Sequence, residues 1–154
     1  MTIKISEKIQ QFWNSFISSD ENYTHLKDYK FHAWSFGYTS DLANKLGALV
    51  LSGKKTATCS LLRSYRGYED EIPRAGVFSV LCDGSENPLC IILITHTWIE
   101  KFSDVDDRQA FEEGEGDRTL AYWRKVHIDF FTEYYKDFSE DEDLLCERFK
   151  IVYK

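Results

Sequence analysis

Apolar side chains recur at helical spacing in two segments of the first third of the chain. Ser6 can cap a helix that runs to about Ser18, because its hydroxyl can accept a hydrogen bond from the first helical turn. Ser40 can cap a second helix and Gly53 can end it, since glycine tolerates the left-handed backbone that often follows a helix. The apolar faces that predict these helices are Ile9, Phe12, Trp13, Phe16 and Ile17 in the first, and Leu42, Leu46, Leu49 and Val50 in the second.

The pattern changes to strands after the second helix. Segments rich in β-branched and apolar residues predict strands at about residues 56–62, 77–82 and 89–98. Residues 83–88 have the composition of a turn, so the last two of these strands are expected to be joined there. Residues 145–153 alternate apolar and polar side chains, which predicts a closing strand.

Two further helices are predicted between the third strand and the closing strand. One covers about residues 104–111, and the glycines of residues 114–116 end it. Asp117 is expected to cap the other, in which His127 lies on the apolar face and is interpreted as a core histidine. Helices followed mainly by strands predict an α+β fold, here a small β-barrel decorated by helices.

Composition indicates one globular domain of 154 residues, with 43% hydrophobic and 29% charged residues. The net charge of −7 disfavours a general binder of long nucleic acids, whose affinity depends on neutralising phosphates. Residues 54–74 differ, because five basic and three acidic residues make this segment net positive. A local positive site is therefore possible, although an ordinary mixed surface explains the same charges.

The cysteines indicate a reducing compartment. Cys59, Cys82, Cys90 and Cys146 form no CxxC pair, and no histidine lies at metal-ligand spacing from them. We expect free, mostly buried thiols and a cytoplasmic protein. The residues after Met1 contain no apolar signal region, and no segment is long enough to span a membrane.

The first candidate chemical feature is the run from Ser52 to Thr58, in which a helix passes into a strand. If the backbone bends there, Lys55 and Thr58 can meet at one site. A lysine beside apolar walls loses proton affinity and could act as general base for a threonine hydroxyl. The alternative is a solvated lysine pair followed by plain strand residues. A phosphate-binding P-loop is excluded, because its first glycine is absent and its strand-to-helix order is reversed.

The second feature is an acidic run at residues 111–117. One of its carboxylates could pair with Lys55, bind a substrate amine or contribute to a metal site, although the EF-hand ligand spacing is absent. The alternative is an acidic loop before a capped helix. Farther on, Arg124 could reach a phosphate or carboxylate, and tyrosines of the basic segment such as Tyr65 could line a binding site. The carboxylates concerned are Glu112, Glu113, Glu115 and Asp117.

Taken together, these segments resemble ASCH-domain proteins over about residues 36–153. The resemblance implies a PUA-like fold, a pseudo-barrel with a cleft used for RNA or nucleosides. The whole chain, residues 1–154, would then be a single ASCH domain in which helix 6–18 is an addition to the core. The segments that carry the resemblance are residues 41–58, Ala75–Val80, Ala110–Asp117, Tyr122–Arg124 and Cys146–Phe149.

Short members of this family include amidohydrolases that remove the acetyl group from N4-acetylcytidine. Their catalytic residues are similar to Lys55, Thr58 and Glu113 here, and Glu115 is the alternative to Glu113. We expect no cofactor and no metal. The residues expected to bind substrate are Lys54, Thr56, Arg63, Tyr65, Glu115 and Arg124.

Three functions remain open at this level. In an amidohydrolase, Thr58 would attack the amide carbonyl, Lys55 would take its proton, and Glu113 would orient the lysine or assist the leaving amine. In a ribonuclease, Lys55 would stabilise charge on the phosphate. In a non-catalytic RNA-binding module, a base would stack on Trp98 or Tyr65. The expected partner is a modified nucleoside or short RNA, with no DNA and no membrane.

Overall fold

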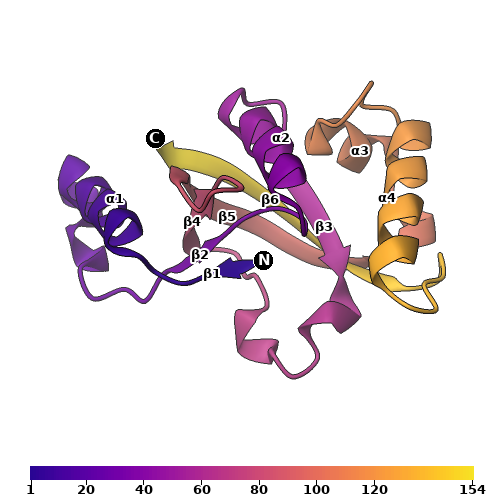
Figure 1. Cartoon of the computed structure of the whole chain (residues 1–154), viewed down its shortest axis with the longest axis horizontal. Coiled ribbons are helices and arrows are strands. Elements are labelled where there is room, and N and C mark those ends of the chain that lie inside the picture. Colours follow the sequence, from indigo (N-terminus) through magenta and orange to yellow (C-terminus); the bar gives the residue numbers. More distant parts are fainter. The chain divides into compact units, whose positions relative to one another are not determined.

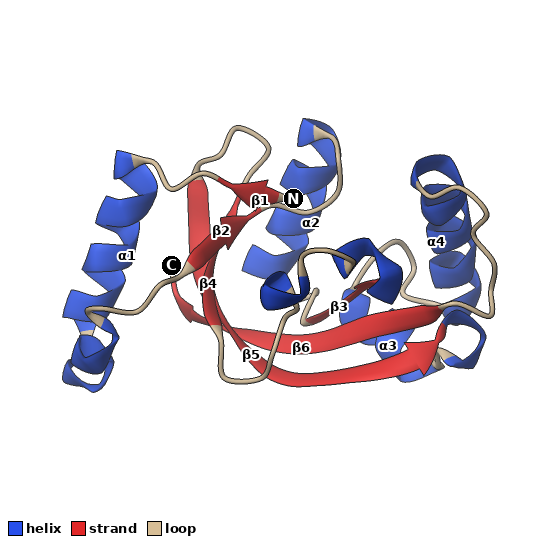
Figure 2. Ribbon diagram, turned by 90° about the horizontal axis from the view of Figure 1, so that it is seen from below, coloured by secondary structure: helices blue, strands red, loops and turns tan.

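The computed structural model describes all residues, 1–154, and their contacts divide the chain into two compact units. The first unit comprises residues 1–52, 76–93 and 150–154, and the second comprises residues 53–75 and 94–149. Two long neighbouring strands, β5 and β6, contribute to both units (Figures 1 and 2). β5 spans Pro88–Lys101 and β6 spans Asp143–Tyr153.

The first unit combines two helices with strands β1, β2 and β4 and part of β5. β2 pairs with β1 in antiparallel and with β4 in parallel orientation, and β4 pairs with β5 in antiparallel orientation. Its elements, besides the parts of β5 and β6, are β1 (Thr2–Ile3), α1 (Glu7–Ser19), η1 (Glu21–Leu26, a 3-10 helix), β2 (His32–Trp34), α2 (Ser40–Leu51) and β4 (Phe78–Cys82).

Aromatic rings fill the core of this unit. The Trp13 ring of α1 stacks on Phe31 at 4.3 Å and on Tyr29 at 5.7 Å between centroids. The predicted cap of α1 is confirmed, because the Ser6 hydroxyl accepts a hydrogen bond from the Ile9 amide. Much of the aromatic content thus serves packing. The buried members of this core are Ile3, Ile9, Trp13, Phe16, Leu26, Ala33, Val80, Cys82 and Ile91.

The second unit contains the strand order β5-β6-β3 and two helices beside it. β3 pairs with β6 in antiparallel register from Ala57 opposite Arg148 to Leu61 opposite Leu144. Its elements, besides the parts of β5 and β6, are β3 (Ala57–Leu61), the 3-10 helices η2 (Leu62–Tyr65), η3 (Glu69–Glu71) and η4 (Phe102–Asp104), and the helices α3 (Asp107–Glu113) and α4 (Leu120–Tyr134).

Helix α3 lies along the outer edge of β3. The Thr56 amide donates to the Glu112 carbonyl at 2.8 Å, and the Gln109 side-chain amide donates to the Thr58 carbonyl at 3.4 Å. These bonds satisfy backbone groups that an edge strand would otherwise leave unpaired. They also hold the acidic run next to the lysine run, 58 residues apart in sequence at Lys55 and Glu113.

The helices and the mostly antiparallel sheet confirm the α+β fold class, but two caps differ from the prediction. The cap of α2 is Thr39, one residue before the expected Ser40. Helix α4 is capped by Thr119 and not by Asp117, because Arg118 has a left-handed backbone (φ 64°) that excludes it from a helix. The Asp117 carboxylate instead accepts bonds from the amide and hydroxyl of Thr119.

The four cysteines are free, as expected, and three of them are buried. None of the helices combines the length and the apolar character needed to cross a membrane.

Two glycines with nearly the same backbone conformation provide a test of the approach between α3 and the chain before β3. Gly114 (φ +75°) ends α3, and a Cβ there would lie 2.4 Å from the Lys54 carbonyl oxygen. Gly53 (φ +77°) has nothing within 4 Å. We predict that Gly53→Ala costs about 1–2 kcal/mol of unfolding free energy, the ordinary cost of the left-handed conformation. Gly114→Ala will cost clearly more, as measured by chemical denaturation, and equal losses would contradict this packing.

Candidate active site

Lys55 lies between the end of α2 and the start of β3, and its side chain is 1% exposed. Its ammonium nitrogen Nζ lies 3.2 Å from Oε2 of Glu113 and 3.4 Å from Oε1 of Glu115. It also donates to the Glu113 carbonyl at 3.4 Å. The lysine run and the acidic run therefore meet, which makes the solvated lysine pair of the alternative interpretation wrong for Lys55.

The charge of Lys55 differs from the expectation. Burial acts to lower its pKa, but the charges of Glu113 and Glu115 act in the opposite direction and leave the pKa above its ordinary value of 10.5. Lys55 is consequently an ammonium ion at neutral pH. An ammonium has no lone pair to accept a proton, so this arrangement disfavours Lys55 as a general base, and that role stays a prediction.

Glu113 is the buried acid of the site, at 1% exposure. Its Oε1 accepts hydrogen bonds from Trp123 Nε1 at 2.9 Å and from Gln109 Nε2 at 3.0 Å. Burial acts to raise its pKa, but the charges of Lys55 and His127 hold the pKa far below its usual range. Glu115 is more exposed, at 17%, and contacts Lys55 through one oxygen. This distinguishes Glu113 from Glu115 in position, although both face the lysine.

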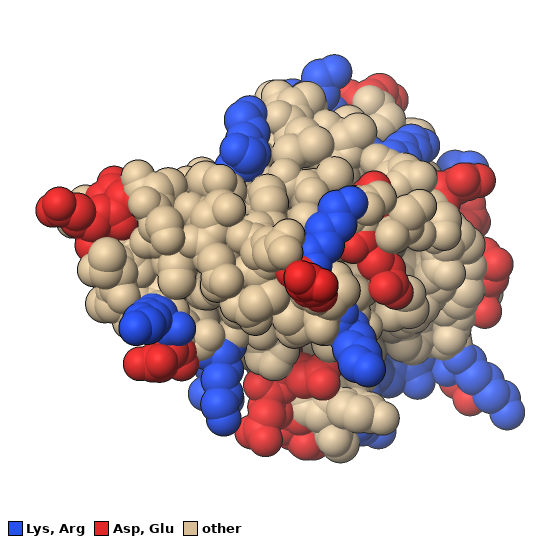
Figure 3. Space-filling view, turned by 60° about the vertical axis from the view of Figure 1, so that its left-hand side comes forward, with Lys and Arg blue, Asp and Glu red and all other residues tan.

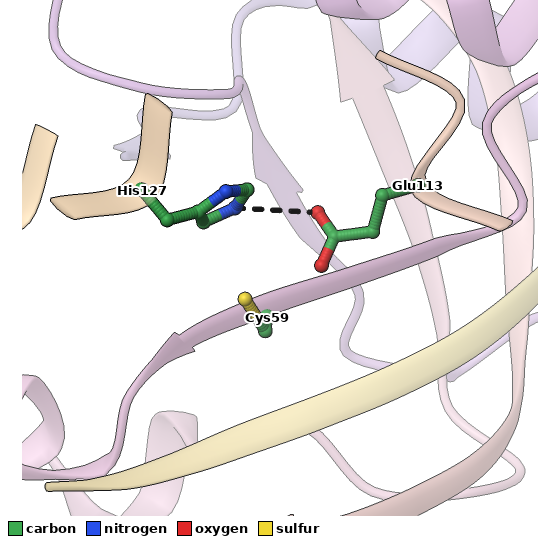
Figure 4. Close-up of side chains that lie close together, drawn as sticks. All are labelled: Cys59, Glu113 and His127. Carbon is green, nitrogen blue, oxygen red and sulfur yellow. Dashed lines mark ion pairs between the residues drawn. The ribbon is translucent and has the colours of Figure 1, made fainter. Parts of the chain in front are cut away.

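His127 belongs to the same cluster, which the sequence interpretation as a core histidine missed. Its ring stacks on Trp123, and its Nδ1 lies 2.8 Å from the Trp123 carbonyl oxygen, so Nδ1 carries a proton. Its Nε2 faces Glu113 Oε2 at 3.5 Å (Figure 4). The ring is hydrogen-bonded, as predicted, and it also lies beside the buried acid.

Cys59, Glu113 and His127 also form the residue set most similar to a metal site. One possible ligand atom of each lies within 4.8 Å of the others (Figure 4). However, the Glu113 oxygens already accept bonds from donors that include the Lys55 ammonium, and a dication would have to displace that charge. Burial also raises the pKa of the Cys59 thiol well above its ordinary value. The cluster therefore fits an ion pair better than a metal ion.

Thr58 lies close to this cluster in sequence but is not bonded to it through its side chain. Strand alternation places Cys59 and Thr58 on opposite faces of β3. No hydrogen bond joins the Thr58 hydroxyl to Lys55 or to Glu113; only the Thr58 carbonyl contacts the cluster, through Gln109. Thr58 is half-buried, so its hydroxyl has room on its own face.

Tyr65, which was expected to line a binding site, lies on the face of β3 that bears Thr58. Its hydroxyl is 3.1 Å from the Ser60 hydroxyl, and Ser60 follows Thr58 by two residues on the same face of β3. Lys54 and Thr56 are exposed at the lysine run, where their backbones bond to α3 or to the turn after it. Of these three residues, Tyr65 is the one that contacts the Thr58 face, through the Ser60 hydroxyl.

The two arginines expected to bind substrate are engaged elsewhere. Arg63 forms an ion pair with Glu142 at 2.7 Å and donates to the Lys136 carbonyl. Arg124 donates to the carbonyls of Phe102, Ser103 and Val105 and so holds the η4 turn. Both hold loops of the second unit, and their role in substrate binding stays a prediction.

Glu147 is the residue that the sequence interpretation missed. It lies on β6 directly opposite Thr58 and is only 5% exposed. Burial raises its pKa to about 7; the charge of Lys55 lowers the pKa and that of Glu113 raises it. The sequence pattern could have indicated this buried carboxyl. In the alternation of residues 145–153, Glu147 stands between Leu145 and Phe149 on one side of the strand.

Charged side chains are mixed in sign on the face drawn in Figure 3, where lysines and arginines lie among aspartates and glutamates and much of the surface is uncharged. No broad basic area appears on that face. The positive character of residues 54–74 is further reduced, because the ammonium of Lys55 is buried and paired.

Fold and site together define an α+β domain with a buried lysine–glutamate pair beside an edge strand. The ASCH domain family profile matches residues 32–153, and the chain belongs to this family. The crystal structure of an ASCH domain from Lactobacillus crispatus JV V101 superposes with a TM-score of 0.85 and 32% identity, covering 97% of each chain. A protein of Enterococcus faecalis V583 from the family DUF984 gives a TM-score of 0.81 and 35% identity, covering 96% of this chain and 94% of its own.

These matches confirm the predicted ASCH family and its PUA-like fold. No curated protein matches the chain.

The buried pair predicts strong energetic coupling between its two residues. Lys55→Met leaves the Glu113 carboxylate buried without its main counter-charge, and we expect a loss of about 3–5 kcal/mol in unfolding free energy. Glu113→Gln leaves Lys55 with Glu115 and will cost less. The double variant will lose less than the sum of the two single losses, as measured by urea denaturation. Additive losses would show that the two side chains do not interact in solution.

Proposed function

We propose that this ASCH domain is an amidohydrolase that removes the acyl group from an N4-acetylcytidine-like nucleoside. The observation that carries the proposal is the buried ammonium of Lys55 at the start of the strand that bears Thr58. These residues, with Glu113, are the ones that the family resemblance implies for deacylation. RNA and nucleosides are the partners associated with this fold family.

In this proposal Thr58 is the nucleophile. A threonine hydroxyl can form a covalent acyl intermediate when a base takes its proton. Lys55 supplies fixed positive charge near the tetrahedral intermediate, where negative charge develops on the former carbonyl oxygen. Glu113 and Glu115 keep Lys55 protonated and in place, so they act through the lysine. Tyr65, on the Thr58 face, is the residue placed to contact the nucleoside.

The charge of the protein supports a small neutral substrate over a polymer. An acetylated nucleoside carries no phosphate, so the net charge of −7 does not oppose its binding. A ribonuclease or an RNA-binding module would gain affinity from exposed basic side chains. Here Arg63 and Arg124 are bonded to carbonyls or a carboxylate, and Lys55 is buried.

The proposal is tested by incubating the pure protein with N4-acetylcytidine and measuring cytidine by chromatography. Thr58→Ala will reduce cytidine formation by about a hundredfold or more, because it removes the nucleophile. Thr132→Ala, on an exposed position of α4, removes the same hydroxyl without affecting the site and serves as the matched control.

Two results would count against the proposal. Cytidine formation that survives Thr58→Ala would place the nucleophile elsewhere. No cytidine at any practical protein concentration would exclude this substrate, and assays of RNA cleavage and of salt-dependent RNA binding would then distinguish the ribonuclease from the binding module.

A further inference from the structure

Deacylation by Thr58 requires a group that accepts the proton of its hydroxyl. Among the residues that the family resemblance implies, none is hydrogen-bonded to that hydroxyl. Lys55 is already protonated and paired with two carboxylates. Glu113 accepts bonds from Lys55, Trp123 and Gln109, so its oxygens are occupied. Neither forms a hydrogen bond with the Thr58 hydroxyl. The base must therefore be a different side chain on the face of β3 where Thr58 lies.

Glu147 occupies that face. Residues directly opposite each other in an antiparallel pair point to the same side of the sheet, with Cβ atoms about 4.5–5.5 Å apart. Thr58 and Glu147 form such a pair between β3 and β6. A hydroxyl and a carboxylate on neighbouring Cβ atoms at this separation can approach within hydrogen-bond distance by rotation of the longer glutamate side chain.

Glu147 is also unusual among the buried charged residues of the chain. At 5% exposure it forms neither an ion pair nor a side-chain hydrogen bond, whereas Lys55 and Glu113, at 1% exposure, have several partners. Buried carboxyls are normally paired or hydrogen-bonded, since burial of an unpaired charge is costly. The Glu147 carboxyl therefore has oxygens free to accept a proton from the Thr58 hydroxyl during a reaction.

We propose that the Glu147 carboxylate accepts the proton of the Thr58 hydroxyl when that hydroxyl attacks an acyl carbonyl. The proposal rests on the proposed function for the role of Thr58 as nucleophile, and it assigns the role of proton acceptor to Glu147 in place of Lys55. Lys55 then contributes charge alone.

The proton and electron balance is complete with these groups. Thr58 Oγ forms a bond to the acyl carbon as its proton moves to Glu147. The C–N bond then breaks, the nucleoside amine takes the proton from Glu147, and the acyl group remains as an ester of Thr58. Water attacks this ester, gives one proton to Glu147, and the carboxylic acid leaves as Thr58 Oγ takes that proton back.

The surroundings of Glu147 set its protonation near neutral pH. Burial raises its pKa to about 7, the Lys55 charge at the start of β3 lowers the pKa, and the Glu113 charge at the end of α3 raises it. The charged side chains of β5 have other partners: Glu100 accepts from Trp98 and Cys146, and Lys101 donates to the Asp141 carbonyl. A base with a pKa near the working pH is the most effective proton acceptor.

The direct test measures the reactivity of Thr58 without the nucleoside. The protein is treated with p-nitrophenyl acetate, quenched at short times, and the acetyl group on the peptide that contains Thr58 is quantified by mass spectrometry. The rate for the wild type will rise with pH to a plateau above about pH 7, as Glu147 ionises. Glu147→Gln will lower this rate by about a hundredfold and abolish its pH dependence.

The matched control is Glu133→Gln, at an exposed position of α4, which will retain the wild-type rate and pH dependence. Wild-type acetylation of Thr58 that persists in Glu147→Gln would overturn the proposal, and so would a wild type in which Thr58 is not acetylated. Glu147-dependent acetylation of Thr58 together with no turnover of N4-acetylcytidine would support the proposal while excluding the proposed substrate. The two ideas therefore fail separately.

A second readout tests the titration of Glu147 in the folded protein and shows that the variant folds. A carboxyl whose pKa is higher in the folded than in the unfolded state costs stability as pH rises from the unfolded pKa to the folded one. For Glu147 that window runs from its ordinary value of 4.5 to about 7. The unfolding temperature of Glu147→Gln relative to the wild type will therefore increase between about pH 5 and about pH 8. A difference that is independent of pH would contradict the proposed base.

Discussion

The buried ion pair of Lys55 and Glu113 is the interaction on which the rest of the site depends. Both side chains are 1% exposed, so each would carry a large desolvation cost without the other. The pair joins α3 to the chain before β3, where a Cβ at Gly114 would lie 2.4 Å from the Lys54 carbonyl oxygen. Helix α4 then supplies Trp123 and His127 to the same carboxylate. Three segments of the second unit, the chain before β3, α3 and α4, thus meet at a single carboxyl group.

A pair of this kind is a poor means of gaining stability, because a well-packed apolar pair often serves as well. Its consequence here is electrostatic. The positive charge of Lys55 is held in place just before the edge strand β3, and the carboxylates of Glu113 and Glu115 favour its protonated form. Fixed charge that needs no reorganisation is what stabilises a developing oxyanion most effectively. The same arrangement disfavours Lys55 as a proton acceptor, and in our proposal Glu147 takes that role.

Much of the fold could be predicted from the sequence, because the patterns are local. The cap of α1, the apolar faces of α1 and α2 and the strand segments follow from propensity and periodicity, whereas the cap of α2 lies one residue before the expected Ser40. The meeting of Lys55 with the acidic run was suggested by charge and by family resemblance. The start of α4 was misplaced at Asp117, since the left-handed backbone at Arg118 depends on the loop it closes and has no signature of its own.

The parts of the site that could not be predicted depend on distances between segments far apart in sequence. Apolar walls beside Lys55 predicted a lowered pKa, whereas the two carboxylates that raise the pKa are brought to Lys55 by the packing of α3 on β3. The sequence does not show that Arg63 and Arg124 donate to loop carbonyls, because those loops are far from them along the chain. The alternation of β6 shows that Glu147 shares a face with apolar residues, but only the register with β3 shows that it faces Thr58.

The ionisation state of Lys55 tests this account most directly. In side-chain NMR of protein labelled at lysine, the Lys55 signal can be assigned by its absence from the spectrum of Lys55→Met and followed with rising pH. The account predicts an ammonium that shows no titration up to its ordinary pKa of 10.5, while exposed lysines such as Lys125 serve as internal references. A titration midpoint near about pH 7 to 8 would contradict it, because Lys55 would then be neutral enough to act as the base itself.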